Sequence, residues 1–575
     1  MSMNVTRAIL LLALIGLFSA CTREPEPPVD TLLQHVPADT PYVFVTSKPL
    51  PTPLRDKLGD HYAAQLAAQG PALQRVRDRL TASPEGEKFL TTSGRLFDVV
   101  EALFAEFEHR DTAAAMRELG VEPVTRSAFY GIGLLPAVRI EIADEAKLNA
   151  LLDRVEKRAG VTADKGVSQG LAYRRMDLGP VDAVIAVRDG FLIAGLLADQ
   201  LFERDLGLLL GHSLPEHKLS DTGDVAKLIA RHGFTGYGEG FFRLDTFVAA
   251  LLGKGEGRNA EVMQALAETP LPTSEACLQM TEHLVAGMPR MVMGITRADD
   301  TQLVARGIWE STPAVAGYLQ KMAAPVPGVG ADFEGLMSFG LGLDLPQLRN
   351  AIDALLREVM DAGAACEWVD REQLQAVIPQ LNLALGPMTA GIKGFNFQLD
   401  DLELDPETLA PSRVRAGLLA AVDDPRGIFA LGAMFNPALA ALQVPDDGSL
   451  VDLPIDFGLD QAIPPLKVAI RDKALLLFAG ADTADLASPL LSAVAISPPP
   501  LFSVDYGVYQ MVERFGAMLD RAEAKLIEQG ENDLAGELRE QLEGFRLQAR
   551  LFERLRVSVH ASAEGLVMDQ VMQLR

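Results

Sequence analysis

VDAVIAVRDGFLIAGLLADQLFERDL (residues 181–206) has a counterpart far downstream, LKVAIRDKALLLFAGADTADL (466–486). In both stretches the alternation of apolar residues predicts two strands, and Arg-Asp followed by Gly or Lys predicts the tight turn between them. A helix is expected to begin near the Ala-Asp pair that follows. Two strands joined by so short a turn pair antiparallel, so these stretches predict an antiparallel sheet.

A second pair of stretches also predicts two hairpins. RMVMGITRADDTQLVARGIWE (290–310) and RLRVSVHASAEGLVMDQVMQL (554–574) each predict a hairpin. Between the hairpins the sequence repeatedly predicts a strand, a polar residue and an amphipathic helix, at 137–159, 237–252, 337–360, 427–443 and 500–520. Two long helices, broken near 528–533, are expected after the last of these strands.

Polar residues stand near several of these strand–helix junctions, namely Asp245, Asp344, Asn436 and Asp505. Such residues can accept hydrogen bonds from the first turn of a helix and face the positive end of its dipole. A ring of catalytic acids is the alternative interpretation. The spacing is the one that a cap requires, so we expect caps.

The order of the predicted elements repeats along the chain. We therefore predict an α+β fold, built by tandem duplication of strand–helix–hairpin modules into mainly antiparallel sheets, with helices covering one face. A chain of 575 residues exceeds what one core usually supports. The expected organisation is a first half at 37–310, a Pro/Gly-rich linker at 311–335 and a second half at 336–575.

The N-terminus reads LLLALIGLFSACTREPEPP at 10–28, behind a single basic residue, Arg7. The apolar run at 8–18 is shorter than the roughly 20 residues that a membrane-spanning helix needs. A short apolar run behind one positive charge and ahead of small residues is typical of a secretory signal. Here the small residues are Ser19 and Ala20, and Cys21 follows them directly.

These residues resemble the lipobox of bacterial lipoproteins, with Phe18 where leucine is usual. The resemblance implies that residues 1–20 are a signal peptide and that Cys21 becomes diacylated on sulfur and acylated on its new amino group. Thr22, rather than Asp, then favours the outer membrane of a Gram-negative cell, and 21–36 form a Pro-rich spacer. A plain cleaved signal before a chance cysteine and an uncleaved anchor are the alternatives.

Composition narrows the class of protein. The chain has 52 basic and 78 acidic residues, a net charge of −26, which argues against a nucleic-acid partner and against a broad anionic membrane face.

Besides Cys21 there are two cysteines, Cys277 and Cys366. In an exported protein we expect them to form one disulfide, which would join the predicted halves; two buried free thiols are the alternative.

Catalytic and metal-binding patterns are weak. GVSQG (166–170) matches the string around hydrolase nucleophiles, but Ser168 is expected in a polar loop rather than at a strand–helix elbow. His212, His217 and His232 could hold a metal, yet their spacing favours solvated loops. The acidic stretches 401–407 and 444–452 are interpreted as solvated turns, and the basic stretch 72–80 as a solvated helix face. We therefore expect no metal, cofactor or catalytic residue.

The stretch PADTPYVF (37–44) resembles the opening of uncharacterised bacterial envelope proteins that carry a domain of unknown function. The resemblance implies repeated strand–helix–hairpin units and no particular activity. The leading hypothesis is a non-enzymatic lipoprotein of the outer membrane that faces the periplasm and binds or scaffolds an envelope protein or an apolar ligand. A carrier of lipid or other apolar cargo and an unrecognised periplasmic hydrolase are the alternatives.

Overall fold

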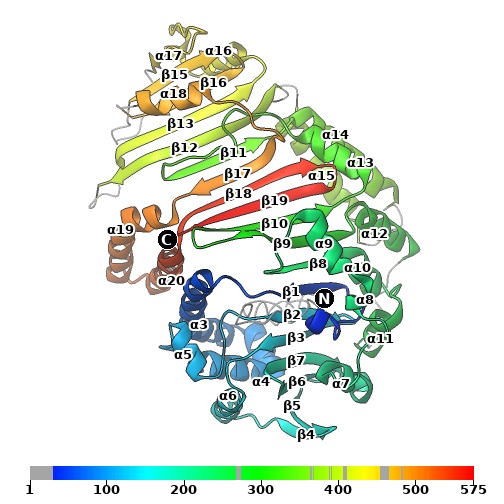
Figure 1. Cartoon of the computed structure of the whole chain (residues 1–575). Helices are drawn as coiled ribbons and strands as arrows, with labels where there is room; N and C mark the ends of the chain where they lie inside the picture. Colours follow the sequence, from blue (N-terminus) through cyan, green and yellow to red (C-terminus); the bar gives the residue numbers. More distant parts are fainter. Residues whose placement is uncertain are drawn as a thin grey trace. The chain divides into compact units, whose positions relative to one another are not determined.

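The structure, a computed structural model, describes residues 30–266, 274–362, 366, 368–386, 389, 391–405, 411–453, 465–480 and 483–575. The predicted signal peptide and Cys21 lie outside these residues. The chain divides into two compact units, which we treat separately (Figure 1). Unit 1 runs up to Pro272 and includes Pro289–Ala305, and unit 2 comprises Thr273–Met288 and Arg306–Arg575.

The strands of unit 1 pair antiparallel in the order β4-β5-β6-β7-β3-β2-β1-β8-β9 (Figure 1). Their bounds are β1 (Tyr42–Thr46), β2 (Ser127–Ile132), β3 (Leu135–Glu141), β4 (Asp164–Ser168), β5 (Leu171–Asp177), β6 (Val181–Arg188), β7 (Phe191–Ala198), β8 (Glu239–Arg243) and β9 (Arg290–Ala298). The boundary between the units falls inside the next strand, β10 (Gln302–Glu310), after Ala305.

The helices of unit 1 lie between these strands in the chain. They are α2 (Asp30–Leu33), α3 (Thr52–Thr81), α4 (Pro84–Phe107), α5 (Ala113–Glu118), α6 (Glu145–Ala159), the short 3-10 helix η1 (Asp199–Leu201), α7 (Phe202–Leu210), α8 (Leu219–Thr222), α9 (Asp224–His232), α10 (Leu244–Leu251) and α11 (Gly257–Leu266).

Helices cover both faces of the unit 1 sheet, so the expectation of one covered face is wrong. Leu192 of β7 packs on the core that α3, α4, α5 and α6 form. A Cβ on Gly195 of the same strand would stand 2.7 Å from Leu209 of α7. Residues three apart in a strand point to opposite faces, so these two helical layers lie on opposite sides of the sheet.

The strands of unit 2 pair antiparallel in the order β14-β15-β16-β13-β12-β11-β17-β18-β19 (Figure 1). Their bounds are β11 (Met337–Gly342), β12 (Ile392–Leu404), β13 (Pro411–Val422), β14 (Val451–Asp452), β15 (Leu466–Arg471), β16 (Ala474–Ala479), β17 (Pro500–Tyr506), β18 (Phe552–Ser562) and β19 (Gly565–Leu574).

Unit 2 contains α12 (Glu275–Gly287), α13 (Pro313–Met322), α14 (Leu345–Ala362), α15 (Arg371–Ala384), α16 (Pro425–Phe435), α17 (Pro437–Ala440), α18 (Ala484–Ser492), α19 (Val508–Glu528) and α20 (Asn532–Leu551). Part of its core joins α18 to the sheet through Leu486 and Leu490, which pack with Leu476 and Phe478 of β16. The segment 311–335, predicted to be a linker, belongs to unit 2.

Most of the predicted local elements are confirmed. The hairpins predicted within 181–206 and 466–486 are β6–β7 and β15–β16, and each is followed by a helix. One prediction of a strand is wrong: the apolar start of 427–443 is helix α16. Asp424 caps this helix through the amide of Gly427 at 2.9 Å, and Pro425 stands in its first turn, so local helix signals outweighed the apolar run.

The acidic stretch 401–407 is also different from its prediction as a solvated turn, because residues up to Leu404 continue strand β12.

The predicted disulfide between Cys277 and Cys366 is confirmed, with the two Cα atoms 4.7 Å apart. Both cysteines belong to unit 2, so the expectation that the bond would join the two halves is wrong. Cys277 lies in α12, and this helix follows unit 1 elements in the chain but packs in unit 2.

Candidate functional site

The PADT turn, which carried the family resemblance, is held inside unit 1 by hydrogen bonds. The Thr40 side chain is completely buried; its hydroxyl accepts from the amide of Gly131 at 3.0 Å and donates to the carbonyl of Tyr42 at 2.8 Å. The amide of Ala38 donates to the carbonyl of His217 at 2.9 Å. These bonds fix the entry into β1, so the turn has a structural role.

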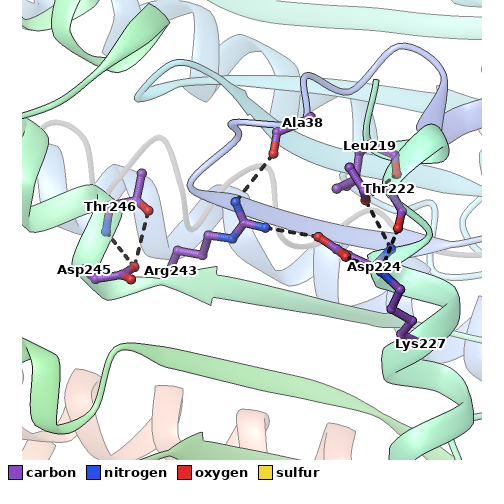
Figure 2. Close-up of polar contacts among 8 residues, drawn as sticks. All are labelled: Ala38, Leu219, Thr222, Asp224, Lys227, Arg243, Asp245 and Thr246. Atoms are coloured by element: carbon purple, nitrogen blue, oxygen red, sulfur yellow. Dashed lines mark hydrogen bonds and ion pairs between the residues drawn. The ribbon is translucent and has the colours of Figure 1, made fainter. Parts of the chain in front are cut away.

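Arg243, at the end of β8, extends this network to the start of α9. Figure 2 shows its guanidinium between the Ala38 carbonyl, at 3.5 Å, and the Asp224 carboxylate, at 3.3 Å. Asp224 also pairs with Lys227 at 3.2 Å. The neighbouring Asp245 turns away to the amide of Thr246, 2.6 Å distant (Figure 2). Asp224 is thus paired with two cations, whereas Asp245 accepts from the amide of the next residue and does not cap α10 as predicted.

The four polar residues at the predicted strand–helix junctions have separate local roles, which do not support the alternative of a ring of catalytic acids. Asp344 is a cap, as predicted: it accepts from the amide of Gln347 in the first turn of α14 at 3.1 Å. Asn436 ends α16 instead of opening a helix after a strand. Asp505 is not a cap either. It lies within β17, where its side chain is buried and faces two arginines.

Asp505 is the centre of a buried charge cluster in unit 2. Its carboxylate accepts from the Nε atoms of Arg554 and Arg556, the latter at 2.8 Å, although only 1% of Asp505 is exposed. Arg554 also donates to the carbonyl of Gly335 at 2.7 Å, and Arg556 pairs with Asp332. A buried carboxylate with two cationic partners is costly to leave unpaired, so this cluster holds segment 332–335 against β17 and β18.

The central strands of unit 2 also bury uncharged polar side chains. Ser338 of β11 stands opposite both Gln398 and Asp505 in the pairing register, and all three are buried. Asn396 is 1% exposed and donates to the carbonyl of Pro327 at 3.4 Å. Directly opposite residues share one face of a sheet. One face of unit 2 is therefore polar at its centre and lies beneath residues 326–335.

Unit 1 has apolar residues at its centre instead. Val43 of β1 stands opposite both Tyr130 and Phe241, and all three are buried. Two residues further along β1, the same face of unit 1 buries two charged side chains, Glu239 opposite Val45 and Arg139 opposite Ala128. The two units thus bury different polar side chains.

A small hollow of about 300 Å³ lies beside the charge cluster, where the segment before β11, the bulge of β12 and the first turns of α19 meet. Its lining residues are Glu334, Gly335, Leu336, Asp400, Gln510, Glu513 and Arg514. Arg514 is held by Asp401 at 3.0 Å. Three carboxylates, an amide and one guanidinium suit recognition of polar or cationic groups on a partner.

A wider groove of about 550 Å³ lies between α3, α4 and α6 in unit 1. Small residues, among them Gly70, Ala102 and Ala105, line it together with charged ones. Arg77, from the basic stretch noted in the sequence, lines this groove and pairs with Asp98 and Glu101 at 2.5 and 2.7 Å. The prediction of a helix with acidic partners holds for Arg77.

Glu239 and His35 are among the titratable groups of unit 1 with strongly displaced pKa values. Burial raises the pKa of Glu239, at the start of β8, to about 7. The side chain is 2% exposed; Oε2 accepts from the amide of Gly238 at 3.0 Å, while Oε1 has no hydrogen-bond partner within the described part of the chain. Burial, with the charges of Arg139 and Arg188, lowers the pKa of His35 to about 4.

Within the described residues, the Glu239 side chain accepts from a backbone amide, and the charges that act on His35 are those of arginines. Arg139, beside His35, donates to the carbonyl of Leu209 at 2.7 Å, where the negative end of the α7 dipole stabilises its charge.

Ser168 ends β4 in the β4–β5 hairpin, and the next two residues have positive φ angles. It therefore lacks the strand–helix elbow of a hydrolase nucleophile.

The histidines named from the sequence are also placed separately. The Nδ1 atom of His212 lies 3.0 Å from Arg188, and the ring of His232 lies 5.5 Å from that of Phe234. Within the residues that the structure describes, no three His, Cys, Asp or Glu side chains gather as metal ligands would.

Comparisons with protein-family models, with curated proteins and with solved structures find no match to this chain. None of the described helices is both long enough and apolar enough to cross a membrane.

Proposed function

We propose that this chain is a lipoprotein of the bacterial outer membrane that faces the periplasm and acts there as a non-enzymatic binding or scaffolding module. The observation that carries the anchor is the sequence context of Cys21, a short apolar run and two small residues directly before the cysteine. The disulfide in unit 2 agrees with an oxidising compartment. A lipid anchor leaves the acidic body outside the bilayer.

The body is proposed to be a tandem duplication. Three features of the pairing order support it. In each unit a central strand, β1 or β11, pairs on one side with a hairpin, β2–β3 or β12–β13. That hairpin pairs with a second one, β6–β7 or β15–β16. On its other side the central strand pairs with β8 or β17, which in turn pairs with β9 or β18.

The two units then differ in their sites, which favours binding over structural repetition alone. The central strands of unit 2 bury Ser338, Gln398 and Asp505, whereas those of unit 1 bury Val43, Tyr130 and Phe241. The hollow beside the charge cluster of unit 2 is lined by charged groups, so a protein partner with polar or cationic groups fits it better than an apolar cargo does. The observation that supports binding is this hollow, bounded by Asp400, Glu513 and Arg514.

The anchor is tested by replacing Cys21. Intact mass and membrane fractionation are measured for the wild type, for Cys21→Ser and, as a matched control, for Ser19→Ala before the cleavage site. We expect three acyl chains on the wild type and on the control, and no acylation of Cys21→Ser, which should stay unprocessed. Processed wild-type protein without acyl chains would refute the anchor.

The binding module is tested by site-specific photocrosslinking in cells. A photoreactive residue replaces Gln510 in the hollow, and Glu203, an exposed residue of α7, serves as the control position. A discrete crosslinked envelope protein at position 510 and none at 203 is the expected result. Native mass spectrometry of the purified body distinguishes a binding module from a carrier of apolar cargo. A co-purified mass of lipid size, released on denaturation, would favour the carrier.

A further inference from the structure

Arg139 of β3 is buried in unit 1 without a counter-charge. Its side chain is 6% exposed, and its guanidinium donates to two neutral oxygens, the carbonyl of Leu209 at 2.7 Å and the hydroxyl of Tyr130 at 3.4 Å. Within the described residues it forms no ion pair with a carboxylate. Arginines are almost never fully buried unless they are paired. In the same unit, for comparison, Arg175 donates twice at 2.8 Å to the buried Asp182.

A second arginine, Arg188 of β6, projects from the same face of the sheet. Arg139 stands opposite Ile193 of β7. Ile193 in turn stands opposite Ala186, two residues before Arg188. Residues that stand opposite one another, and residues two apart in one strand, share a face. Both guanidiniums therefore lie on the face of the sheet that α7 covers.

Two histidines beside these arginines carry hydrogen-bond donors without an acceptor. The Nε2 atom of His35 lies 3.4 Å from the amide nitrogen of Gln34, which can only donate, so the ring hydrogen of the neutral His35 is on Nδ1. The Nδ1 atom of His212 accepts from Arg188 at 3.0 Å, so its ring hydrogen is on Nε2. His35 Nδ1 and His212 Nε2 are both buried and have no hydrogen-bond partner in the described part of the chain.

These groups converge at the C-terminal end of α7. Burial, with the charges of Arg139 and Arg188, lowers the pKa of His35 to about 4, so its ring is neutral at pH 7 and lies near both guanidiniums. Gly211, which ends α7 with a φ angle of 77°, has no side chain between them: a Cβ there would stand 2.8 Å from Nη2 of Arg139 and 3.2 Å from Nδ1 of His35. Among the described residues, the carboxylate that pairs with this cluster is the 81% exposed Asp189, bound to Arg188 at 2.9 Å.

We propose that the cluster of His35, Arg139, Arg188 and His212 binds a small oxyanion, such as phosphate, where the end of α7 meets β3 and β6. An oxyanion supplies the negative charge that Arg139 lacks, and its oxygens can accept from the unused N–H groups of the two histidines. The site belongs to unit 1, so it is separate from the hollow of unit 2 to which a protein partner is assigned above.

The experiment is isothermal titration calorimetry of inorganic phosphate into the full mature protein in detergent, at pH 7 and low ionic strength. Wild type is compared with Arg188→Gln, with His35→Phe and with Arg426→Gln, a matched control that removes an exposed arginine of α16 in unit 2. We expect a single phosphate per chain in the wild type and in the control, and an affinity weakened about tenfold or more in the two cluster variants. Sulfate and acetate are titrated in the same way, to distinguish a tetrahedral oxyanion from a carboxylate as the preferred ligand.

Two results would overturn the proposal. Failure of all three anions to bind the wild type would mean that the buried donors bond to water alone. Equal affinity in the wild type and in both cluster variants would place the anion elsewhere on the protein. Hydrogen exchange of β3 and β6 verifies that each variant is folded. If His35→Phe does not fold, Arg188→Gln decides the question, because the Arg188 side chain is 39% exposed and tolerates replacement.

Discussion

Replacement of Glu239 by glutamine should stabilise unit 1 at alkaline pH. The carboxyl group is 2% exposed and its burial raises its pKa from 4.5 to about 7. The amides of Gly238 and Gly236 and the charge of Lys48 act in the opposite direction without offsetting the burial. Glutamine keeps the size and one acceptor oxygen but carries no charge at any pH.

The magnitude follows from the displacement of the pKa. The folded protein binds this proton more tightly than the unfolded chain does, so the free energy of unfolding falls as the pH rises from about 4.5 to about 7. Each pKa unit corresponds to about 1.4 kcal/mol, which gives a loss of about 3 kcal/mol in the wild type above pH 7. Glu239→Gln removes this loss, so it should gain stability at pH 8 and change little at pH 4.5.

The assay must separate the two units. Both tryptophans, Trp309 and Trp368, belong to unit 2, so their emission during urea unfolding reports that unit. Hydrogen exchange of β1 and β8 reports unit 1 over the same urea series at pH 4.5, 6, 7 and 8. An exposed glutamate, Glu203, changed to glutamine is the control. The reasoning is refuted if the wild type and Glu239→Gln lose the stability of unit 1 in parallel as the pH rises.

Two further substitutions test the contacts around the site. Asp505→Asn leaves the buried Arg554 without a counter-charge, while Arg556 keeps Asp332, and should destabilise unit 2 by about 3–5 kcal/mol, measured by tryptophan emission in urea; a loss below 1 kcal/mol would contradict the buried cluster. Thr40→Val leaves the buried amide of Gly131 without its acceptor and should cost unit 1 about 1–3 kcal/mol by hydrogen exchange of β2, with no change in tryptophan emission.

Much of the local structure was predictable because its signals lie within a few residues. The alternation in 181–198 and 466–479 places apolar side chains on one face, and the turns at Asp189 and Asp472 adopt the positive φ angles that tight hairpins need. The cap at Asp344 is likewise local, since its acceptor and its donor amide are three residues apart. The strand expected at the start of 427–443 is helix α16 instead, because Asp424 and Pro425 are an equally local signal for a helix start.

The candidate site was much less predictable. Asp505 stands three residues before the first residue of α19, so its position alone suggests a cap, but the side chains of Arg554 and Arg556 reach it across the pairing of β17 with β18. Nothing in the sequence around Asp505 indicates that its partners are Arg554 and Arg556, about 50 residues away. The displaced pKa of Glu239 likewise depends on what covers β8, and the sequence contains only a glycine-rich strand there.

The sequence by itself determined the hairpins, one of the four predicted caps, the acidic charge and the residues that could form a disulfide. Periodicity, turn chemistry and capping act over spans of a few residues and do not depend on the rest of the chain. Only the tertiary structure decided that both faces of the unit 1 sheet are covered, that Asp505 is the centre of a buried charge cluster and that α12 belongs to unit 2. These features arise from the packing of segments that are distant in sequence, and burial acts on whichever side chains that packing encloses.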